Sequence, residues 1–311
     1  MLYSGVTVAN EGSFEDSLSF EEEVAANFWN TVAQKHKADV YFINARMDDM
    51  TTDHLIYNIK ENKQCKNCVL ILTTNGGSAD AAYRMVRAIR HFYSQGTFTL
   101  FALGRCKSAG TLVALGADTI VMGHFGEFGP LNVQLHKKDS LVLRHSGLNT
   151  VECIAKLNNQ LYSCFQESFF SLLRDAGVSI TTQTAADIAY KLSIGLFSPM
   201  SKQIDPIEFV DIHRATEVAR DYAKRLSDTK RKPLSNDCIE KLVHGYRDHG
   251  FVIDYKEAVE IFGRDVVTFL PKEYIEFEDD CYELVRDSLS PLFITTHVAS
   301  FIAEGQENTA L

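Results

Sequence analysis

The chain has 311 residues and a formal net charge of −10, from 31 Lys and Arg against 41 Asp and Glu. A charged fraction of 23% and a hydrophobic fraction of 45% are typical of globular proteins and exclude a wholly disordered chain. The acidity argues against broad nucleic-acid binding, which needs a dense cationic surface.

No apolar run approaches the roughly 20 residues that a membrane-spanning helix needs, so we expect no membrane span. The first residues lack the basic start and apolar stretch of a signal peptide, and a cytoplasmic protein is the expectation. Seven cysteines make an odd number, and Cys65 and Cys68 form a lone CxxC without a second pair. We therefore expect reduced thiols rather than disulfides, no metal site and no cofactor.

The N-terminal stretch 1–39 is predicted to be an acidic helical extension. Phe20, Val24, Phe28 and Val32 recur at helical spacing, which favours a helix packed on the main domain or on a neighbouring subunit.

From residue 40 short apolar runs alternate with helical patterns, and this alternation predicts parallel strands joined by right-handed crossovers. The predicted strands are 40–47, 68–74, 97–104 and 118–123, and the predicted helices between them are 49–62, 78–93 and 108–117.

Residues 148–229 are predicted to be mainly helical, and the polar stretch 228–237 is a predicted boundary. Beyond it we expect a helix, a short strand at 251–254, a helix from Tyr255, an acidic helix at 276–290 and fraying last residues. The expected organisation is an extension at 1–39, a main domain at 40–229 and a C-terminal helical extension at 230–311 packed on the core.

Two junctions of small residues follow successive predicted strands, at 74–78 and 107–111. Ser108 would lie at a helix N-terminus, where unpaired N–H groups stabilise an oxyanion, and Gly76 and Gly77 allow close approach of a substrate. A serine nucleophile of this kind performs acyl transfer if a base is available. Each junction taken alone is more often an ordinary turn or an N-cap. Neither contains a nucleotide-binding glycine motif.

Longer stretches strengthen the interpretation. The residues NCVLILTTNGGSADAAYRMVRAIR (67–90) resemble the Gly-Gly segment of the Clp protease/crotonase superfamily. The residues RCKSAGTLVALGADTIVMGHFGEFGPLNVQL (105–135) resemble the nucleophile segment of its serine dehydrogenase proteinase family, which is related to signal peptide peptidase A. The similarity continues through 178–209 and 213–226 and covers about 65–229, and GYRDHGFVID (245–254) is similar to a tail motif of some relatives.

The resemblance implies an α/β fold, a Clp/crotonase-like spiral of parallel strands in ββα units with flanking helices. It implies Ser108 as nucleophile and the amides of Gly76, Gly77 and Ala109 as the oxyanion hole. Where Clp proteases carry their catalytic His, this chain has Val133. Signal peptide peptidases use a Lys, which needs desolvation to act as a base. Lys138, beside Asp139, is the leading candidate.

Several other residues stay open as base or orienting group: His136, Lys137 and His249, with Lys107, Lys156 and His124 favoured less. Asn132 replaces an Asp that relatives tend to carry, and Arg247-Asp248 departs from the tail motif, which puts activity more than fold in doubt.

The resemblance favours an intracellular serine peptidase of the Ser-Lys type that acts on a peptide or protein substrate, and it implies assembly into homo-oligomers. Two alternatives remain. One is a latent or non-catalytic scaffold with a regulatory protein partner. The other is crotonase-type acyl-CoA chemistry, against which the serine motif counts.

Overall fold

A computed structural model describes residues 6–9, 29–131, 134–136, 144–175, 180–202, 206–229, 233–246, 248–275, 277–279 and 292–296. The chain divides into two compact units, one made of Met1–Leu131 with Val218–Leu311 and the other of Asn132–Glu217. The limits expected from the sequence after residues 39 and 229 remain predictions.

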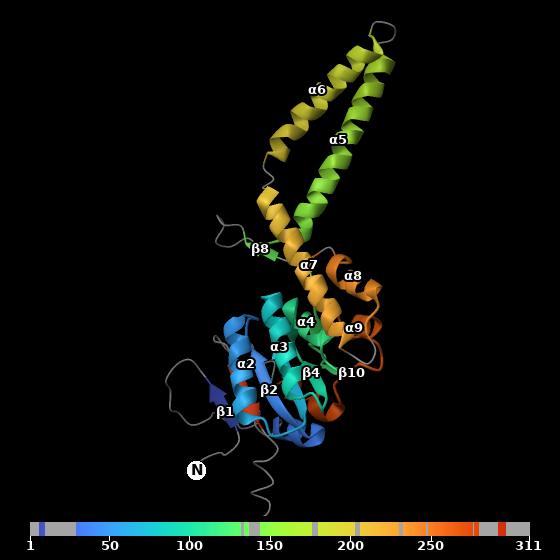
Figure 1. Ribbon diagram of the computed structural model, residues 1–311. Coiled ribbons are helices and arrows are strands. Elements are labelled where there is room, and N and C mark those ends of the chain that lie inside the picture. Colours follow the sequence, from blue (N-terminus) through green and yellow to red (C-terminus); the bar gives the residue numbers. More distant parts are fainter. Residues whose placement is uncertain are drawn as a thin grey trace, which may run out of the picture. The chain divides into compact units, whose positions relative to one another are not determined.

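A seven-stranded sheet organises the first unit, in the order β1-β11-β2-β3-β4-β6-β10 (Figure 1). Five neighbouring strands are parallel: β2 (Ala38–Asn44), β3 (Asn67–Thr73), β4 (Phe98–Ala102), β6 (Thr119–Met122) and β10 (Val267–Phe269). Two antiparallel strands extend the β2 edge, β11 (Leu292–Thr296) and then β1 (Val6–Ala9). The predicted α/β class with a parallel sheet is confirmed.

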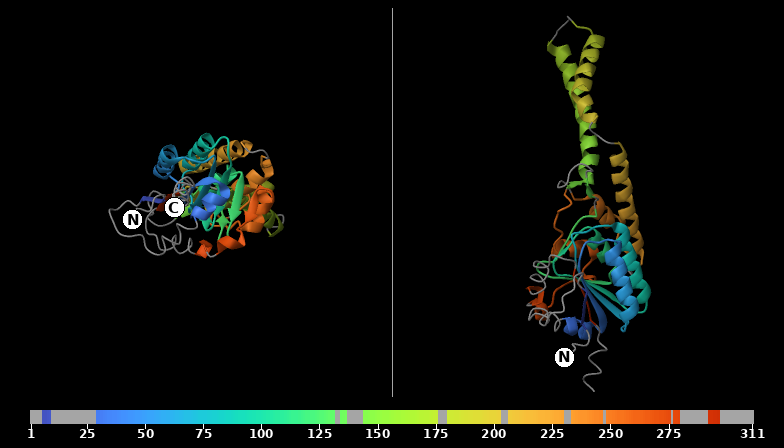
Figure 2. Two further views of the ribbon diagram at one scale, coloured as in Figure 1. Left: turned by 90° about the horizontal axis from the view of Figure 1, so that it is seen from below. Right: turned by 90° about the vertical axis from the view of Figure 1, so that its left-hand side faces the viewer.

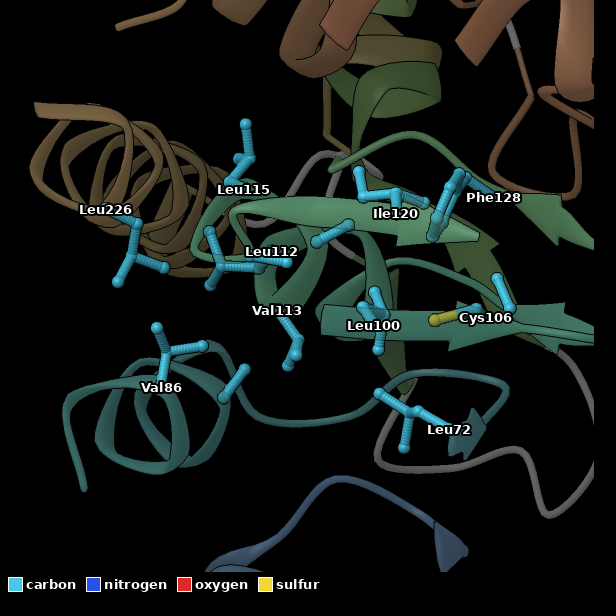
Figure 3. Packing of buried hydrophobic residues seen from close by; sticks show 14 of the residues in the cluster. Leu72, Val86, Leu100, Cys106, Leu112, Val113, Leu115, Ile120, Phe128 and Leu226 are labelled. Atoms are coloured by element: carbon cyan, nitrogen blue, oxygen red, sulfur yellow. The ribbon is translucent and has the colours of Figure 1, made fainter. Parts of the chain in front are cut away.

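Both faces of this sheet are buried, as expected for parallel strands with helical crossovers. Along β2, Tyr41 and Ile43 face one core, whereas Val40 and Phe42 face the other. The first core is covered by helices that include α2 (Asp49–Asn62), α3 (Ala79–Phe92) and α4 (Ala109–Leu115). Figure 2 shows α2 and α3 side by side on one face of the sheet, and Figure 3 shows side chains of α3, α4 and the strands packed together.

The opposite face is covered by segments from the two ends of the unit. Trp29, Val32 and Ala33, from a helical stretch at 29–36, pack with Leu270 and Tyr274. A helix packed on the main domain was one of the two arrangements predicted for the N-terminal extension. Residues 10–28, which carry the rest of the predicted apolar stripe, lie outside the described residues.

Side-chain caps fix where the helices around the sheet begin. Asp48 accepts a hydrogen bond from Thr51 N at the start of α2, and Ser78 accepts one from Ala81 N at the start of α3. Two further caps of this kind start α8 (Asn236–His244) and α9 (Tyr255–Phe262). The short strands β5 (Arg105–Cys106) and β7 (Glu127–Phe128) form a separate parallel pair.

The second unit is a helical hairpin that follows a small β-hairpin. β8 (Gln134–His136) pairs antiparallel with β9 (Arg144–Ser146), and α5 (Gly147–Asp175) and α6 (Thr182–Ser201) run side by side (Figure 1). α7 (Pro206–Asp228) follows, and its residues from Val218 on belong to the first unit. Among the described residues, no helix is both long enough and apolar enough to cross a membrane.

Candidate active site

The turn between β3 and α3 contains the predicted Gly-Gly pair. Gly76 and Gly77 have φ angles of +104° and +150°, in the region that side chains rarely adopt. A β-carbon on Gly77 would lie 2.1 Å from the carbonyl oxygen of Met47. Met47 N donates to Gly76 O (3.0 Å), and Ser78 N donates to Met47 O (2.7 Å). The loop that follows β2 therefore holds the Gly-Gly turn in place.

Ser108 lies on the sharp turn between β5 and α4. Its φ and ψ angles are +52° and −107°, and Ser108 and Lys37 are the non-glycine residues with positive φ in the described part of the chain. Such a conformation costs about 1–3 kcal/mol and persists only where the surroundings impose it. Ser108 occupies the N-cap position of α4, yet its side chain makes no capping hydrogen bond. The hydroxyl is thus left available on a strained strand-to-helix turn, the geometry of a nucleophile elbow.

The two predicted junctions meet. Thr74 N donates to Arg105 O (2.7 Å), and Lys107 N donates to Thr74 O (3.0 Å). A β-carbon on Gly76 would lie 2.8 Å from Ser108 Cβ and 3.3 Å from Ser108 Oγ. Glycine is therefore needed at position 76 both for its φ angle and for the room that Ser108 occupies.

The backbone amides around Ser108 differ in their bonding. Gly76 N donates to the buried Thr74 Oγ1 at 3.1 Å, so this predicted oxyanion-hole amide already has an acceptor. For the amides of Gly77 and Ala109, the hydrogen bonds within the described residues include no acceptor. An anionic oxygen bound at this turn would find these two donors without first breaking a bond.

A third segment passes the Ser108 turn after β7. The buried Thr111 Oγ1 donates to Gly129 O (2.7 Å) and accepts from Gly129 N (3.1 Å). A β-carbon on Gly129 would lie 3.1 Å from Lys107 Cδ and 3.5 Å from Ser108 N. The first turn of α4 thereby fixes the chain that leads to the predicted base segment.

The predicted base segment itself falls largely outside the described residues. Asn132, Lys137, Lys138 and Asp139 are not described, and His136 is described only as a backbone position that pairs with Arg144 in the β8–β9 hairpin. Their roles stay predictions from the sequence.

The less favoured candidates have identifiable surroundings. Lys156 is exposed on α5, and His124 pairs through Nδ1 with the buried carboxylate of Glu278 (2.8 Å). The Lys107 ammonium lies 3.3 Å from Glu127 Oε1 and donates to the carbonyl oxygens of Gly250 (3.0 Å) and Phe251 (3.4 Å).

His249 precedes Gly250 in the turn between α8 and α9 and is partly exposed. The bonds from Lys107 therefore bring the His249 turn to the residue next to Ser108. The lysine side chain and this turn are far apart in sequence, and no local pattern signalled the contact.

Two buried cysteines of the first unit are unfavourable nucleophiles. Burial raises the pKa of the Cys106 thiol, two residues before Ser108, and burial likewise raises the pKa of Cys68 within the CxxC pair. Both thiols are therefore held in the protonated form. Among the described residues, no group of three or more His, Cys, Asp or Glu side chains is placed to hold a metal ion.

No family model matches the sequence, and no curated protein matches it. Among solved structures it is similar to the 1510-N membrane-bound stomatin-specific protease in complex with a substrate peptide, at 22% identity and a TM-score of 0.29, over 39% of this chain and 58% of that chain. A second structure of that protease has 19% identity and a TM-score of 0.27, over 46% and 64% of the two chains.

The ClpP protease catalytic domain from Plasmodium falciparum has 12% identity and a TM-score of 0.39, over 84% of this chain and 99% of that chain. The matches to the stomatin-specific protease span less than two thirds of that protein. With identities and TM-scores this low, the interpretation of the site depends on its own geometry.

Proposed function

We propose that this protein is a serine peptidase of the Clp protease superfamily, of the serine dehydrogenase proteinase type, with Ser108 as nucleophile. The observation that carries the proposal is the conformation of Ser108. Its φ of +52° places an uncapped hydroxyl on a strained turn directly against Gly76. A serine that served only to start α4 would cap it with its side chain, as Ser78 caps α3.

In the proposed reaction Ser108 Oγ attacks the carbonyl carbon of a peptide bond and gives its proton to a general base. The carbonyl oxygen becomes an oxyanion that the amides of Gly77 and Ala109 stabilise. Gly76 joins them once its bond to Thr74 Oγ1 opens. The C–N bond then breaks, and the base returns the proton to the leaving amine. Water attacks the Ser108 ester in a second, equivalent step, which releases the acid and restores the hydroxyl.

For the base we propose Lys138, with Asp139 beside it, on the basis of the sequence. A lysine serves as a base near neutral pH only where desolvation lowers its pKa. His136, Lys137 and His249 are the alternatives. Asn132 cannot supply the carboxylate that relatives tend to carry at this position, so Asp139 is the proposed orienting group.

One observation favours a second function, a latent enzyme or non-catalytic scaffold. The Gly76 amide is bonded to Thr74 Oγ1, so one of the three expected oxyanion donors is engaged within the protein. A regulatory protein partner that shifts this turn would release the donor. Acyl-CoA chemistry would use the same amides without needing Ser108.

We further propose a homo-oligomer in a reducing, cytoplasmic setting. Five described cysteines are free thiols, which supports a reducing setting: Cys65, Cys68, Cys106, Cys164 and Cys238. The helices of the second unit carry large exposed apolar side chains, which a second copy would cover: Tyr162, Phe170, Tyr190, Leu192, Leu196, Met200 and Ile207. Sedimentation velocity of wild type against Leu192→Ser combined with Leu196→Ser tests this, since a monomer in both samples would contradict the assembly.

The activity test is intact-mass spectrometry after incubation with a fluorophosphonate. One adduct is expected on wild type and none on Ser108→Ala. Loss of the adduct in Lys138→Ala, His136→Ala or His249→Ala identifies the base. Absence of an adduct on wild type at every pH from about 6 to 9, where a tuned base is deprotonated, would favour the scaffold.

A further inference from the structure

The Lys107 side chain joins the nucleophile turn to the loop between α8 and α9. It is only 13% exposed, and its ammonium lies within hydrogen-bond distance of the carbonyl oxygens of Gly250 and Phe251. Glu127, 22% exposed, supplies the opposite charge at 3.3 Å. A partly buried ammonium with a carboxylate and two carbonyl acceptors has a defined position, unlike an exposed surface lysine.

The backbone of Lys107 is held as firmly as its side chain. Lys107 N donates to Thr74 O (3.0 Å), and Lys107 O accepts from Gly110 N (2.9 Å). Ser108 follows directly, in a conformation that persists only if its neighbours impose it. The residue before the nucleophile is therefore fixed both by the sheet and by the α8–α9 loop.

The loop at 248–253, here called the tail loop, has a second anchor. Phe128 N donates to Ile253 O and Ile253 N donates to Phe128 O, both at 3.0 Å, and Ile253 is fully buried. Between the two anchors, Phe251 and Val252 remain 45% and 49% exposed. The anchors thus fix the loop beside the Ser108 turn and bury Ile253, while Phe251 and Val252 stay exposed.

Two simpler roles for Lys107, a general base and a purely structural ion pair, explain fewer of its contacts. As a general base it would need its nitrogen directed at the Ser108 hydroxyl, but that nitrogen is directed at the Glu127 carboxylate and at the carbonyl oxygens of Gly250 and Phe251. A purely stabilising ion pair would account for the buried Ile253, but it gives no role to Phe251 and Val252, which stay exposed.

We propose that Lys107 is a positioning residue that holds the tail loop as one wall of the peptide-binding surface beside Ser108. Phe251 and Val252 then face an apolar side chain of the peptide substrate. The inference rests on the proposed function, because it takes Ser108 as the nucleophile.

The test compares rates of fluorophosphonate labelling at Ser108 from about pH 6 to 9. Lys107→Met keeps the apolar stem and removes the charge, and Lys60→Met, at an exposed position on α2, is the matched control. Lys107→Met is expected to lower the rate roughly tenfold or more at every pH, with the pH midpoint and thermal midpoint retained. Lys107→Arg is expected to recover part of the rate, because guanidinium donates to the same acceptors.

Several outcomes would overturn the inference. An unchanged rate in Lys107→Met would mean that the ammonium positions nothing, and a lost pH dependence would make Lys107 the base instead. If the fluorophosphonate does not label wild type at all, the proposed function fails and the inference fails with it. If wild type is labelled and Lys107→Met is labelled at the same rate, only the inference fails. Should Lys107→Met not fold, Glu127→Gln removes only the counter-charge and is expected to lower the rate in the same way.

Two further measurements address the loop itself. Hydrogen exchange of the amides at 250–253 is expected to accelerate in Lys107→Met while exchange in β3 and β4 stays slow. With peptide substrates, Phe251→Ser is expected to raise KM for apolar side chains more than it changes kcat. Equal effects on apolar and charged peptides would contradict a substrate-facing Phe251.

Discussion

Gly76 and Ser108 share one space: a β-carbon on the glycine would lie 2.8 Å from the β-carbon of the serine. The two residues come from successive strand-to-helix turns and meet because β3 and β4 are parallel neighbours whose carboxyl ends lie at one edge of the sheet. The pairing of these turns, more than either turn alone, defines the candidate site.

Replacing Gly76 by alanine tests this contact. We expect Gly76→Ala to destabilise the protein by roughly 1–3 kcal/mol because of its φ of +104°, and to slow labelling of Ser108 by about a hundredfold through displacement of the turn. Urea unfolding and labelling kinetics measure the two effects. Gly195→Ala is the control, since Gly195 lies in α6 with open space around it and alanine favours helix by up to about 1 kcal/mol. Unfolding free energy and labelling rate equal to wild type in Gly76→Ala would contradict the proposed steric contact with Ser108.

Thr111 supports the site from within α4. Thr111→Val keeps the shape but leaves the N–H and carbonyl of Gly129 without their buried partner, and we expect a loss of roughly 1–3 kcal/mol in the free energy of unfolding. Thr111→Ser retains the hydroxyl and should lose about 1 kcal/mol or less. Urea denaturation of both variants decides, and an equal loss in the two would mean that the methyl group, not the hydrogen bonds, stabilises the segment.

His36 predicts a pH dependence of stability. Burial, with a smaller effect of nearby Lys35, lowers the pKa of His36 below its ordinary value of 6.5. The unfolded chain then binds the proton more readily than the folded protein, so the contribution of neutral His36 is complete above pH 6.5 and declines as the pH falls below it. His36→Gln should flatten that part of the curve of unfolding free energy against pH. Identical curves for the two proteins would assign the decline to other groups.

Cys106, two residues before Ser108, provides a test of which side chain reacts with a fluorophosphonate. Because burial raises the pKa of Cys106, its thiol should resist iodoacetamide in the folded protein at pH 8, whereas the partly exposed Cys164 should react. Peptide mapping by mass spectrometry reads both sites at once. Cys106→Ala should still form the fluorophosphonate adduct. Loss of the adduct in this variant would indicate that the Cys106 thiol, not Ser108, reacts.

The sequence patterns predicted four of the five parallel strands of the sheet. The apolar runs that became β2, β3, β4 and β6 are short, continuous and bounded by turn residues, and these signals are local. The strand expected at 251–254 is only a bridge between Ile253 and Phe128, while β10, three residues at 267–269, was missed. Strands this short have too few residues to show a period.

The candidate site was predicted only in part, because only part of it depends on local sequence signals. Ser108, Gly76 and Gly77 lie in short motifs at predictable positions, so their meeting followed from parallel topology. The contact of Lys107 with Gly250 joins residues 143 positions apart and depends on how the α8–α9 loop folds back. No periodicity encodes such a contact.

The order of the strands has a consequence for synthesis on the ribosome. β2 has β3 on one side and β11 on the other, and β11 also holds β1. While the nascent chain grows, β1 has no partner and β2 keeps a bare edge until residues 292–296 leave the exit tunnel. The unpaired N–H and C=O groups of that edge can pair with strands of other chains. This protein should therefore depend on a holding chaperone, or on rapid completion of translation, more than a protein whose sheet assembles in sequence order.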